Sequence, residues 1–431
     1  MSRASFRRPF RNLNAVAWQN LALVALITYY AIWFLVSLLY HGFFVSLASD
    51  YLALWSAGHI ANQQGFAQAY RLEALRGVQE SLVPNPDPEN LRFTPIPAPY
   101  LPVFLLPALL LAHLSPQASF WLWTLLNLGA LIGYFIFYAR RSGLFPGVWR
   151  PFLFSLCSFP VFSNFFWGQL NVWLVIFIGE FLWNMQQQRP FKAGLWLAGL
   201  LLKPQTLILI LPLLLFWREW RTLVGFSVVG AGLLALSALL LGGDGIQNFV
   251  HLARFWGREG DALAAINPSY MMNWRMVATH LARGVGNWLG WGIAALASLL
   301  TLWFALRPLP ISPASETLPQ VLLRVLVATL LVTWHAHYHM AMILLPSLWI
   351  GLGKGHIPFR RLLWWVFLPP LVQFFGMVLS LLGVANLVPY EGSNSLLTGL
   401  AMMGTTAAFL FPMQGDIAAL KGVDAGLSGS G

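Results

Sequence analysis

Long runs of apolar residues, separated by short polar connections, fill most of the chain. A bilayer core of about 30 Å needs about 20 apolar residues in a helix, so runs near that length predict membrane-spanning helices. The pattern predicts an all-α polytopic membrane protein with about 12 transmembrane helices, some of them short. The expected passes are 20–47, 118–139, 151–167, 169–186, 191–202, 205–217, 222–241, 288–306, 320–336, 340–353, 362–384 and 396–413.

The run from Pro95 to Leu114 is also apolar, but repeated prolines interrupt it. Proline removes a backbone donor and breaks helices, which leaves no uninterrupted stretch long enough for a full crossing. We therefore expect an interfacial or re-entrant segment here rather than a pass.

Basic residues indicate which ends of the passes face the cytoplasm. With both termini cytoplasmic, most of the 25 Lys and Arg fall inside and most of the 14 acidic residues fall outside. The expected organisation is a cytoplasmic N-terminal segment (1–19), a transmembrane domain (20–413) and a cytoplasmic disordered tail (414–431). Two outer loops, 48–117 and 242–287, are long among otherwise short connections, and long loops often carry function.

Composition agrees with a membrane location, because 58% of the residues are hydrophobic, only 9% are charged, and the mean hydropathy is +0.67. A net charge of +11 would suggest nucleic-acid binding in a soluble chain, but here the basic residues lie between apolar runs. The single cysteine, Cys157, excludes an intramolecular disulfide and a metal site built from clustered cysteines. The sequence has no GxxxxGK[ST] loop, so it offers no motor for ATP-driven transport.

Asp50 lies where the first apolar run leaves the membrane on the outer side. A carboxylate at the bilayer edge is costly unless it is paired or used. One interpretation is a helix-end acid solvated at the interface. The other is a general base that takes a proton from an incoming hydroxyl, with its pKa raised by partial desolvation.

Two amides, Gln169 and Asn171, open a helix on the same outer side. They could cap that helix. Amides also bind sugar hydroxyls or phosphate oxygens without burying a charge, which makes both residues candidates for substrate binding.

Lys203 stands between two apolar runs, followed by Pro204 at the expected apex of a hairpin. Helix lengths place it at or beyond the bilayer midplane. Snorkelling to the outer interface is one interpretation. The alternative, which we favour, is that it binds an anionic lipid headgroup, since an intramembrane charge suggests a functional site. Glu180, in the cytoplasmic half of its pass, is expected to be a hydrogen-bonded structural acid.

Two further outer segments carry polar candidates. In the second loop, Asn267 and Arg275 join an amide to a guanidinium that can bind phosphate through two hydrogen bonds, although ordinary loop polarity explains them equally well. Three histidines at alternate positions surround Tyr338 at another outer turn; they are His335, His337 and His339. Their spacing argues against a metal site and favours hydrogen-bond donation to a phosphate. No metal or other cofactor is therefore expected.

The ordered set of these features resembles glycosyltransferase family 87, the polyprenol-phosphate-mannose-dependent mannosyltransferases of the GT-C superfamily. The resemblance rests on an acid after the first helix, the Pro-rich stretch, Gly168-Gln-Leu-Asn171, Lys203-Pro204, Asn267-Pro-Ser269 and the His337-Tyr338 pair, and it covers most of residues 20–385.

The resemblance implies a GT-C fold with juxtamembrane helices in the first outer loop, and transfer of a sugar, most often mannose, from a polyprenyl-phosphate-linked donor to a glycan or glycolipid acceptor. It implies that Asp50 is the catalytic base and that Lys203 and His337 contact the donor phosphate. Arg275 is a further candidate for the phosphate, and Gln169, Asn171, Tyr338 and Asn267 are candidates for substrate binding. The expected location is the bacterial inner membrane, with the active site on the non-cytoplasmic side.

A lipid-linked-sugar flippase or a secondary transporter is the alternative function, since either would also need many passes, an intramembrane lysine and Pro-broken helices. Against transport, the two halves of the sequence show no evident repeat, and the polar residues gather on one face. Neither function calls for a nucleic-acid partner.

Overall fold

The computed structural model describes residues 15–41, 43–45, 47–83, 95–259, 271–307, 309–310, 316–383 and 393–411, which form helices and no β-strand. The α-helices are α1 (Ala15–Val36), α2 (Ser49–Gln64), α3 (Leu72–Glu80), α4 (Pro102–Leu111), α5 (Pro116–Arg141), α6 (Trp149–Leu156), α7 (Phe159–Trp167), α8 (Asn171–Gln186), α9 (Pro190–Leu197), α10 (Ile210–Phe216), α11 (Trp220–Glu259), α12 (Trp274–Val285), α13 (Asn287–Leu306), α14 (Leu318–Val332), α15 (Leu345–Gly353), α16 (Phe359–Leu381) and α17 (Ser393–Ala407). Shorter 3₁₀ segments include η3 (Ala198–Leu202), η4 (Pro204–Leu207) and η6 (Tyr338–Leu344).

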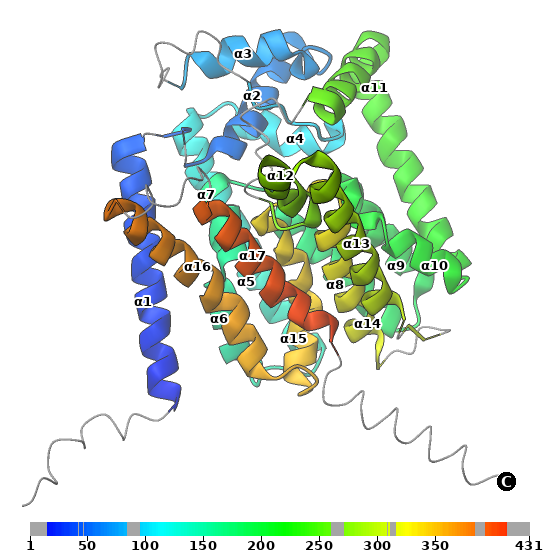
Figure 1. The fold of residues 1–431 in the computed structure, drawn as a ribbon. Helices are drawn as coiled ribbons and strands as arrows, with labels where there is room; N and C mark the ends of the chain where they lie inside the picture. Colours follow the sequence, from blue (N-terminus) through cyan, green and yellow to red (C-terminus); the bar gives the residue numbers. More distant parts are fainter. Residues whose placement is uncertain are drawn as a thin grey trace, which may run out of the picture.

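The helices form a bundle capped at one end by a smaller layer (Figure 1). The upright helices make the lower part of the view, and α2, α3 and α4 lie across its upper end. Helix α11 climbs from the lower end to this layer and bends at Gly242, whose φ of 64° is outside the helical range. Through this bend, the upper part of α11 reaches the cap, where the Asn248 Nδ2 donates to the carbonyl of Ala67 at 3.0 Å.

Within the described residues, five helices are long and apolar enough to cross a membrane: α1, α5, α11, α13 and α16. Six shorter apolar segments accompany them, among them α4, α14 and the η3 and η4 segments with their neighbours. The protein is thus an all-α membrane protein, as the apolar runs predict, while the number of crossings stays a prediction. Helix α4 has 10 residues, or about 15 Å, which is half the thickness of the bilayer core.

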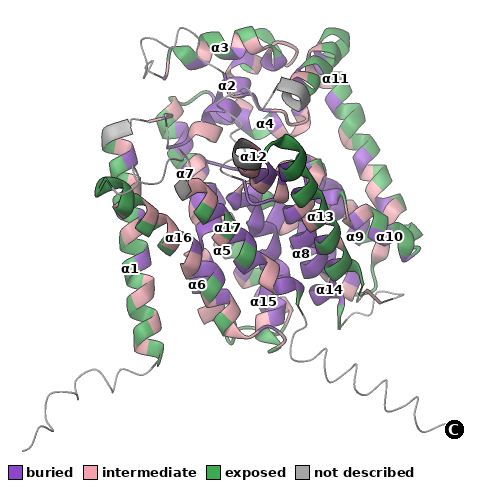
Figure 2. Ribbon diagram, viewed as in Figure 1, coloured by how far each residue is buried: buried purple, intermediate pink, exposed green. Residues whose placement is uncertain are grey.

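Burial separates the inner helices from the outer ones (Figure 2). Every residue of α14 from Leu318 to Leu331 is buried, including the polar Gln320 and Arg324, so no face of this stretch is open to the surroundings. By contrast, α1 and α13 expose most of their apolar side chains, as expected of helices whose outer faces contact lipid. The core of the bundle therefore lies around α8, α14 and α15.

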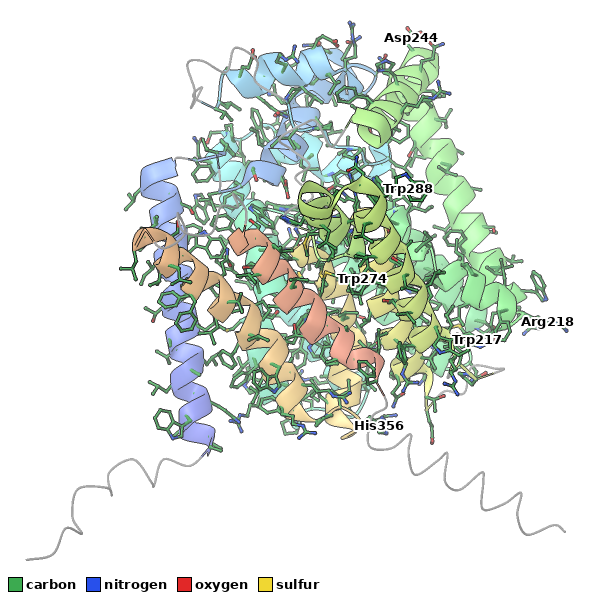
Figure 3. The ribbon with its side chains drawn as sticks, viewed as in Figure 1. Trp217, Arg218, Asp244, Trp274, Trp288 and His356 are labelled. Atoms are coloured by element: carbon green, nitrogen blue, oxygen red, sulfur yellow. The ribbon has the colours of Figure 1, made fainter. Side chains whose placement is uncertain are left out.

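Charged side chains mark two different ends of the molecule (Figure 3). His356 lies at the lower end of the view, Arg218 lies at the right in its lower half, and Asp244 lies at the upper end beside the cap. Which of these ends faces the cytoplasm stays a prediction from the sequence.

The first helix ends earlier than the apolar run suggests. Helix α1 stops at Val36 and continues only as a short π-helical turn to His41. Phe44 and Ala48 then adopt left-handed conformations, with φ of 68° and 60°. A left-handed residue cannot continue a right-handed helix, so the expected pass 20–47 is too long, and Asp50 belongs to the separate helix α2.

Candidate active site

Asp50 lies in the first turn of α2, where the cap meets the bundle. The left-handed Ala48 turns the chain into this helix, and its backbone N–H donates to the carbonyl of Phe166 at 2.8 Å. This bond ties the start of α2 to the end of α7, so the carboxylate is placed next to the turn between α7 and α8.

Gly168 allows that turn to approach α2 closely. Its φ is 75°, and a Cβ atom there would lie 2.5 Å from the Cβ of Tyr51, too close for any side chain. The Trp123 Nε1 donates to the Gly168 carbonyl at 3.2 Å and holds the turn from the other side. Glycine is therefore required both by the backbone conformation and by the contact, and the next residue, Gln169, is brought beside Asp50.

The side chain of Gln169 joins Asp50 to Lys203. Its Nε2 donates to the Asp50 Oδ2 at 2.6 Å, and its Oε1 accepts from the Lys203 Nζ at 2.7 Å. The orientation of the amide follows from its partners, because an ammonium can only donate and a carboxylate can only accept. A base and a cation that are 153 positions apart in the sequence (203 minus 50) are thus linked through one amide.

Lys203 is buried at the break between η3 and η4, with 7% of its surface exposed. Pro204 follows it, and the Lys203 carbonyl accepts from both the backbone N–H of Thr206 at 3.0 Å and the Thr206 hydroxyl at 2.8 Å. The hairpin apex expected from the sequence is therefore present, and its ammonium points to Gln169.

One cavity of about 420 Å³ contains all three of these groups. It is lined by Asp50, Ala53, Ile96, Pro97, Pro99, Tyr100, Gln169, Leu202, Lys203, Pro204, Gln205, Phe249, Ala253, Thr333, Trp334, His335, His337 and His339. Its walls come from the cap, from the upper part of α11, from the Lys203 apex and from the loop before η6.

The wall made by residues 96–100 is held by side chains of the cap. Buried Gln79 on α3 makes two hydrogen bonds of 2.8 Å with the backbone N–H and carbonyl of Ile96. The hydroxyl of Tyr70 donates to the Tyr100 carbonyl at 2.7 Å. An extended segment rich in proline has few backbone donors of its own, so these bonds position it.

The histidine segment forms the opposite wall. The ring centroids of His335 and His337 are 4.7 Å apart, and those of His337 and His339 are 5.6 Å apart. Buried Asn273 holds this loop, because its Nδ2 donates to the Thr333 carbonyl at 2.9 Å while its Oδ1 caps α12. All three rings line the cavity, not only that of His337. Among the residues that the structure describes, no cluster of three or more His, Cys, Asp or Glu has the geometry of a metal site.

Three predicted residues do not line this cavity. The guanidinium of Arg275 lies 4.0 Å from the centroid of the Trp334 ring and donates to the Trp334 carbonyl at 3.2 Å. Asn171 is fully buried and donates to the Oδ1 of Asn164 at 3.0 Å, so it bonds within the fold, and its side chain makes no capping hydrogen bond to α8. The Tyr338 hydroxyl donates to the Ser395 carbonyl at 3.3 Å. Asn267 lies outside the described residues.

Several lining residues were not predicted. Tyr100, Phe249 and Gln205 carry no sequence signal that separates them from other aromatic or amide residues of the chain. His335 and His339 were noted beside His337, but their alternation suggested different faces. In the structure His335 lies in a loop and His339 in the short 3₁₀ segment η6, where the periodicity of an α-helix does not apply.

The surroundings of Asp50 in the cavity shift the pKa of its carboxyl group. Burial raises the pKa of its carboxyl above the usual range, while the hydrogen bond from Gln169 and the charge of Lys203 each lower that pKa. A carboxylate with a raised pKa is a better base than one in water, and its two partners favour its ionised form.

Comparison with known proteins decides the family. The sequence profile of glycosyltransferase family 87 matches residues 99–334, which is more than half of the chain. The chain belongs to glycosyltransferase family 87. Neither a curated protein nor a solved structure matches it. As a family 87 enzyme, it is a membrane glycosyltransferase.

The family match covers part of the cavity. Gln169, Lys203 and Trp334 lie within the matched residues, whereas Asp50 precedes them and His337 follows them. The placement of these last two residues in the cavity of this glycosyltransferase therefore comes from the structure and not from the family match.

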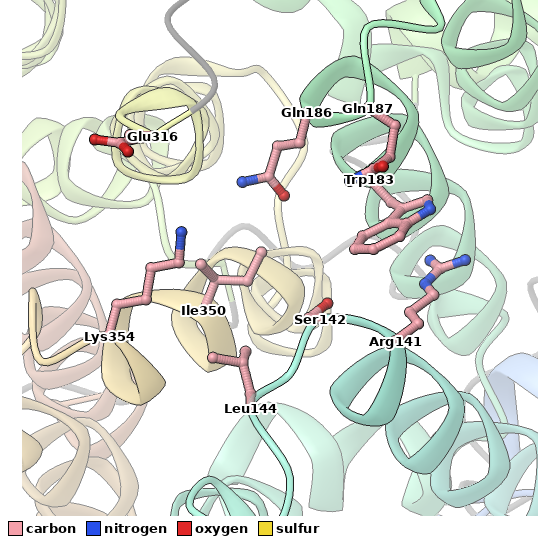
Figure 4. Close-up of a pocket in the computed structure, with 9 residues that line it drawn as sticks. All are labelled: Arg141, Ser142, Leu144, Trp183, Gln186, Gln187, Glu316, Ile350 and Lys354. Atoms are coloured by element: carbon pink, nitrogen blue, oxygen red, sulfur yellow. The ribbon is translucent and has the colours of Figure 1, made fainter.

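A second polar cavity of the glycosyltransferase, of about 310 Å³, lies at the opposite end of the bundle, where α5, α8 and α15 end (Figure 4). Arg141 from its wall donates to Glu180 through both terminal nitrogens, one of them at 3.0 Å. Glu180 is thus a hydrogen-bonded acid, as expected. Glu180 itself does not line this cavity; the carboxylate in its lining is that of Glu316, together with Arg141 and Lys354.

Proposed function

We propose that the enzyme transfers a sugar, with mannose as the first choice, from a polyprenyl-phosphate-linked donor to a hydroxyl of a lipid-linked or glycan acceptor. The reaction would take place on the non-cytoplasmic face of a bacterial inner membrane. The observation that carries the proposal is the cavity in which Asp50 and Lys203 meet through Gln169.

Asp50 acts in this proposal as the general base. Its carboxylate takes the proton of the acceptor hydroxyl as that oxygen attacks the anomeric carbon, and the bond to the carrier phosphate breaks on the opposite face of the sugar. One displacement of this kind inverts the anomeric configuration.

The spacing of the two charges supports this geometry. A single carboxamide separates hydrogen bonds of 2.6 and 2.7 Å, so the charged atoms are at most about 8 Å apart. Inverting glycosidases hold their two catalytic groups about 6.5–9.5 Å apart to leave room for the nucleophile. The Gln169 amide fills the line between Asp50 and Lys203, so the reacting centre would lie beside that amide, within reach of both charged groups.

Lys203 stabilises the carrier phosphate as it leaves with increased negative charge, and His337 is proposed as a second donor to it. The histidines on both sides of His337 enlarge this donor set on the same wall. Arg275 is assigned a supporting role, since it contacts Trp334 of the wall. The carrier phosphate needs no protonation to depart, so fixed cations can serve it without a divalent metal.

The position of the cavity favours an outer active site. It lies against the cap, at the end that carries Asp244 and away from the lower half of the view, which carries Arg218 (Figure 3). Family membership also favours transfer over the alternative of a flippase or transporter.

Replacing Asp50 by Asn tests the proposal. The variant keeps the size of the side chain and an acceptor for Gln169, but it removes the base, and we expect kcat to fall by about 10²–10⁴-fold with donor binding retained. Asp244→Asn is the matched control, because Asp244 is an exposed acid of the same end of the molecule and should leave activity unchanged. Near-normal turnover by a folded, donor-binding Asp50→Asn enzyme would refute the proposed role.

A further inference from the structure

Each end of the Gln169 amide bonds to a charged group of the cavity. Its donor end faces Asp50 and its acceptor end faces Lys203, and 9% of the residue is exposed. Within the described part of the chain, no other side chain bonds to both groups. This arrangement uses one N–H donor and one acceptor position of the amide to join the two charges, whereas the sequence predicted a substrate-binding role for Gln169.

We propose that Gln169 is a positioning residue, whose amide holds the Asp50 carboxylate and the Lys203 ammonium at a fixed separation so that each can act on a different side of the reacting sugar. The proposal rests on the proposed function and adds to it the reason why the base and the cation do not neutralise each other.

The chemistry of the three side chains explains why an amide is needed. An ammonium has only donors, and an ionised carboxylate has only acceptors, so without a spacer they would bond to each other directly. An amide has a donor at one end and an acceptor at the other, which lets it bridge the two while it carries no charge. Lys203 keeps two further N–H donors for a phosphate.

The spacer also leaves one side of the carboxylate free. Gln169 bonds to the Oδ2 of Asp50, and the Oδ1 has no hydrogen-bond partner among the residues described. That oxygen can receive the proton of the acceptor hydroxyl. The hydrogen bond to Oδ2 also restricts rotation of the carboxylate, so the orientation of Oδ1 is fixed.

The backbone around Gln169 is built to hold this position. The Gln169 N–H donates to the Asn164 carbonyl at 2.8 Å, and the preceding Gly168 packs against Tyr51, the neighbour of Asp50. The location of the amide relative to α2 is thus set by the turn itself, and only the side-chain contacts remain to be made.

Two substitutions of similar length test the proposal. Gln169→Met removes both the donor and the acceptor, and Gln169→Glu replaces the donor end by a second acceptor. For Gln169→Met we expect kcat to fall by about 10- to 100-fold, the donor KM to change by less than about threefold, and the acid limb of the pH–rate profile to move to higher pH. Gln169→Glu should move that limb further, because a second carboxylate beside Asp50 disfavours its ionised form.

Gln205→Met is the matched control. Gln205 lines the same cavity, but its amide donates to the sulfur of Met340 at 3.9 Å and contacts neither charged group. The control should leave the acid limb in place. The other titratable groups that face the cavity are Tyr100 and the three histidines, which are present in every variant, so only the difference between profiles reports on Asp50.

The possible outcomes separate the proposals. A folded Gln169→Met enzyme with lowered kcat but an unmoved acid limb would overturn the positioning role, and so would a raised donor KM with unchanged kcat, which indicates direct substrate contact. If Gln169→Met is normal while Asp50→Asn is inactive, the inference fails and the proposed function stands. If Asp50→Asn is active, the proposed function itself fails. Thermal unfolding of both Gln169 variants shows whether they fold, and either folded variant suffices for the test.

Discussion

Removing the charge of Lys203 should alter two properties of the enzyme at once. In Lys203→Met, a side chain of similar length loses its ammonium, so Gln169 loses the donor to its Oε1 and the cavity loses a cation. We expect weaker stabilisation of the leaving phosphate and a less readily ionised Asp50.

The size of both effects follows from the geometry. For unit charges at the largest separation that the two hydrogen bonds allow, about 8 Å, and an effective dielectric constant of about 20, the Coulomb interaction is about 2 kcal/mol, which solvent screening of the partly exposed Asp50 carboxylate lowers. Its loss raises the pKa of the Asp50 carboxyl, so on the acid limb up to about 30-fold less enzyme carries the ionised base at a given pH. The lost hydrogen bond to phosphate costs a further 1.5–3 kcal/mol or so, about 10- to 100-fold in kcat/KM.

The assay is the release of polyprenyl phosphate from a lipid-linked sugar by purified enzyme, measured across a range of pH. Because Asp50 must be ionised to act as the base, activity should fall as pH falls through its raised pKa, and Lys203→Met should begin to fall at higher pH than the wild type. Lys203→Arg keeps the charge and is the control, with an acid limb close to that of the wild type. An unmoved acid limb in a folded Lys203→Met enzyme would refute the electrostatic link between the two residues.

Three other perturbations test separate parts of the structure. Gly168→Ala should lower both the melting temperature and activity by displacing Gln169, since its Cβ would lie 2.5 Å from that of Tyr51, whereas Gly129→Ala meets nothing within 4 Å and should be harmless; equal stability of the two variants would contradict this contact. Glu180→Gln leaves Arg141 without its anion and should destabilise the fold by about 3 kcal/mol in denaturant unfolding, with kcat of the folded fraction unchanged; a change in kcat instead would connect this pair to catalysis. Treatment with EDTA should leave turnover intact, because protein cations serve the phosphate; loss of activity that Mg²⁺ or Mn²⁺ restores would show that a metal takes part.

The apolar runs predicted most of the helices because lipid imposes a simple constraint of length and composition. The expected pass 118–139 corresponds to α5, and 288–306 corresponds to α13. The break after α1 could not be predicted, because it depends on left-handed conformations of Phe44 and Ala48, which are not glycines and carry no local signal.

The part of the candidate site that the sequence predicted consists of polar residues in apolar surroundings. Asp50, Gln169, Lys203 and His337 were chosen because burying a polar group is costly without a purpose, and the structure brings all four to one cavity. The sequence could not reveal which hydrogen-bond partner each of these polar side chains has in the fold. Asn171 has the same amide chemistry as Gln169, two positions away, yet it bonds within the fold while Gln169 joins two charged groups.

An experimental structure with a non-hydrolysable polyprenyl-phosphate-sugar analogue would test the central claim most directly. The account predicts that the phosphate binds within hydrogen-bond distance of the Lys203 Nζ, and that the free oxygen of Asp50 faces the anomeric carbon from the side opposite the phosphate. A phosphate bound in the cavity beside Arg141, or a sugar held with Asp50 and the phosphate on the same side of the anomeric carbon, would contradict it.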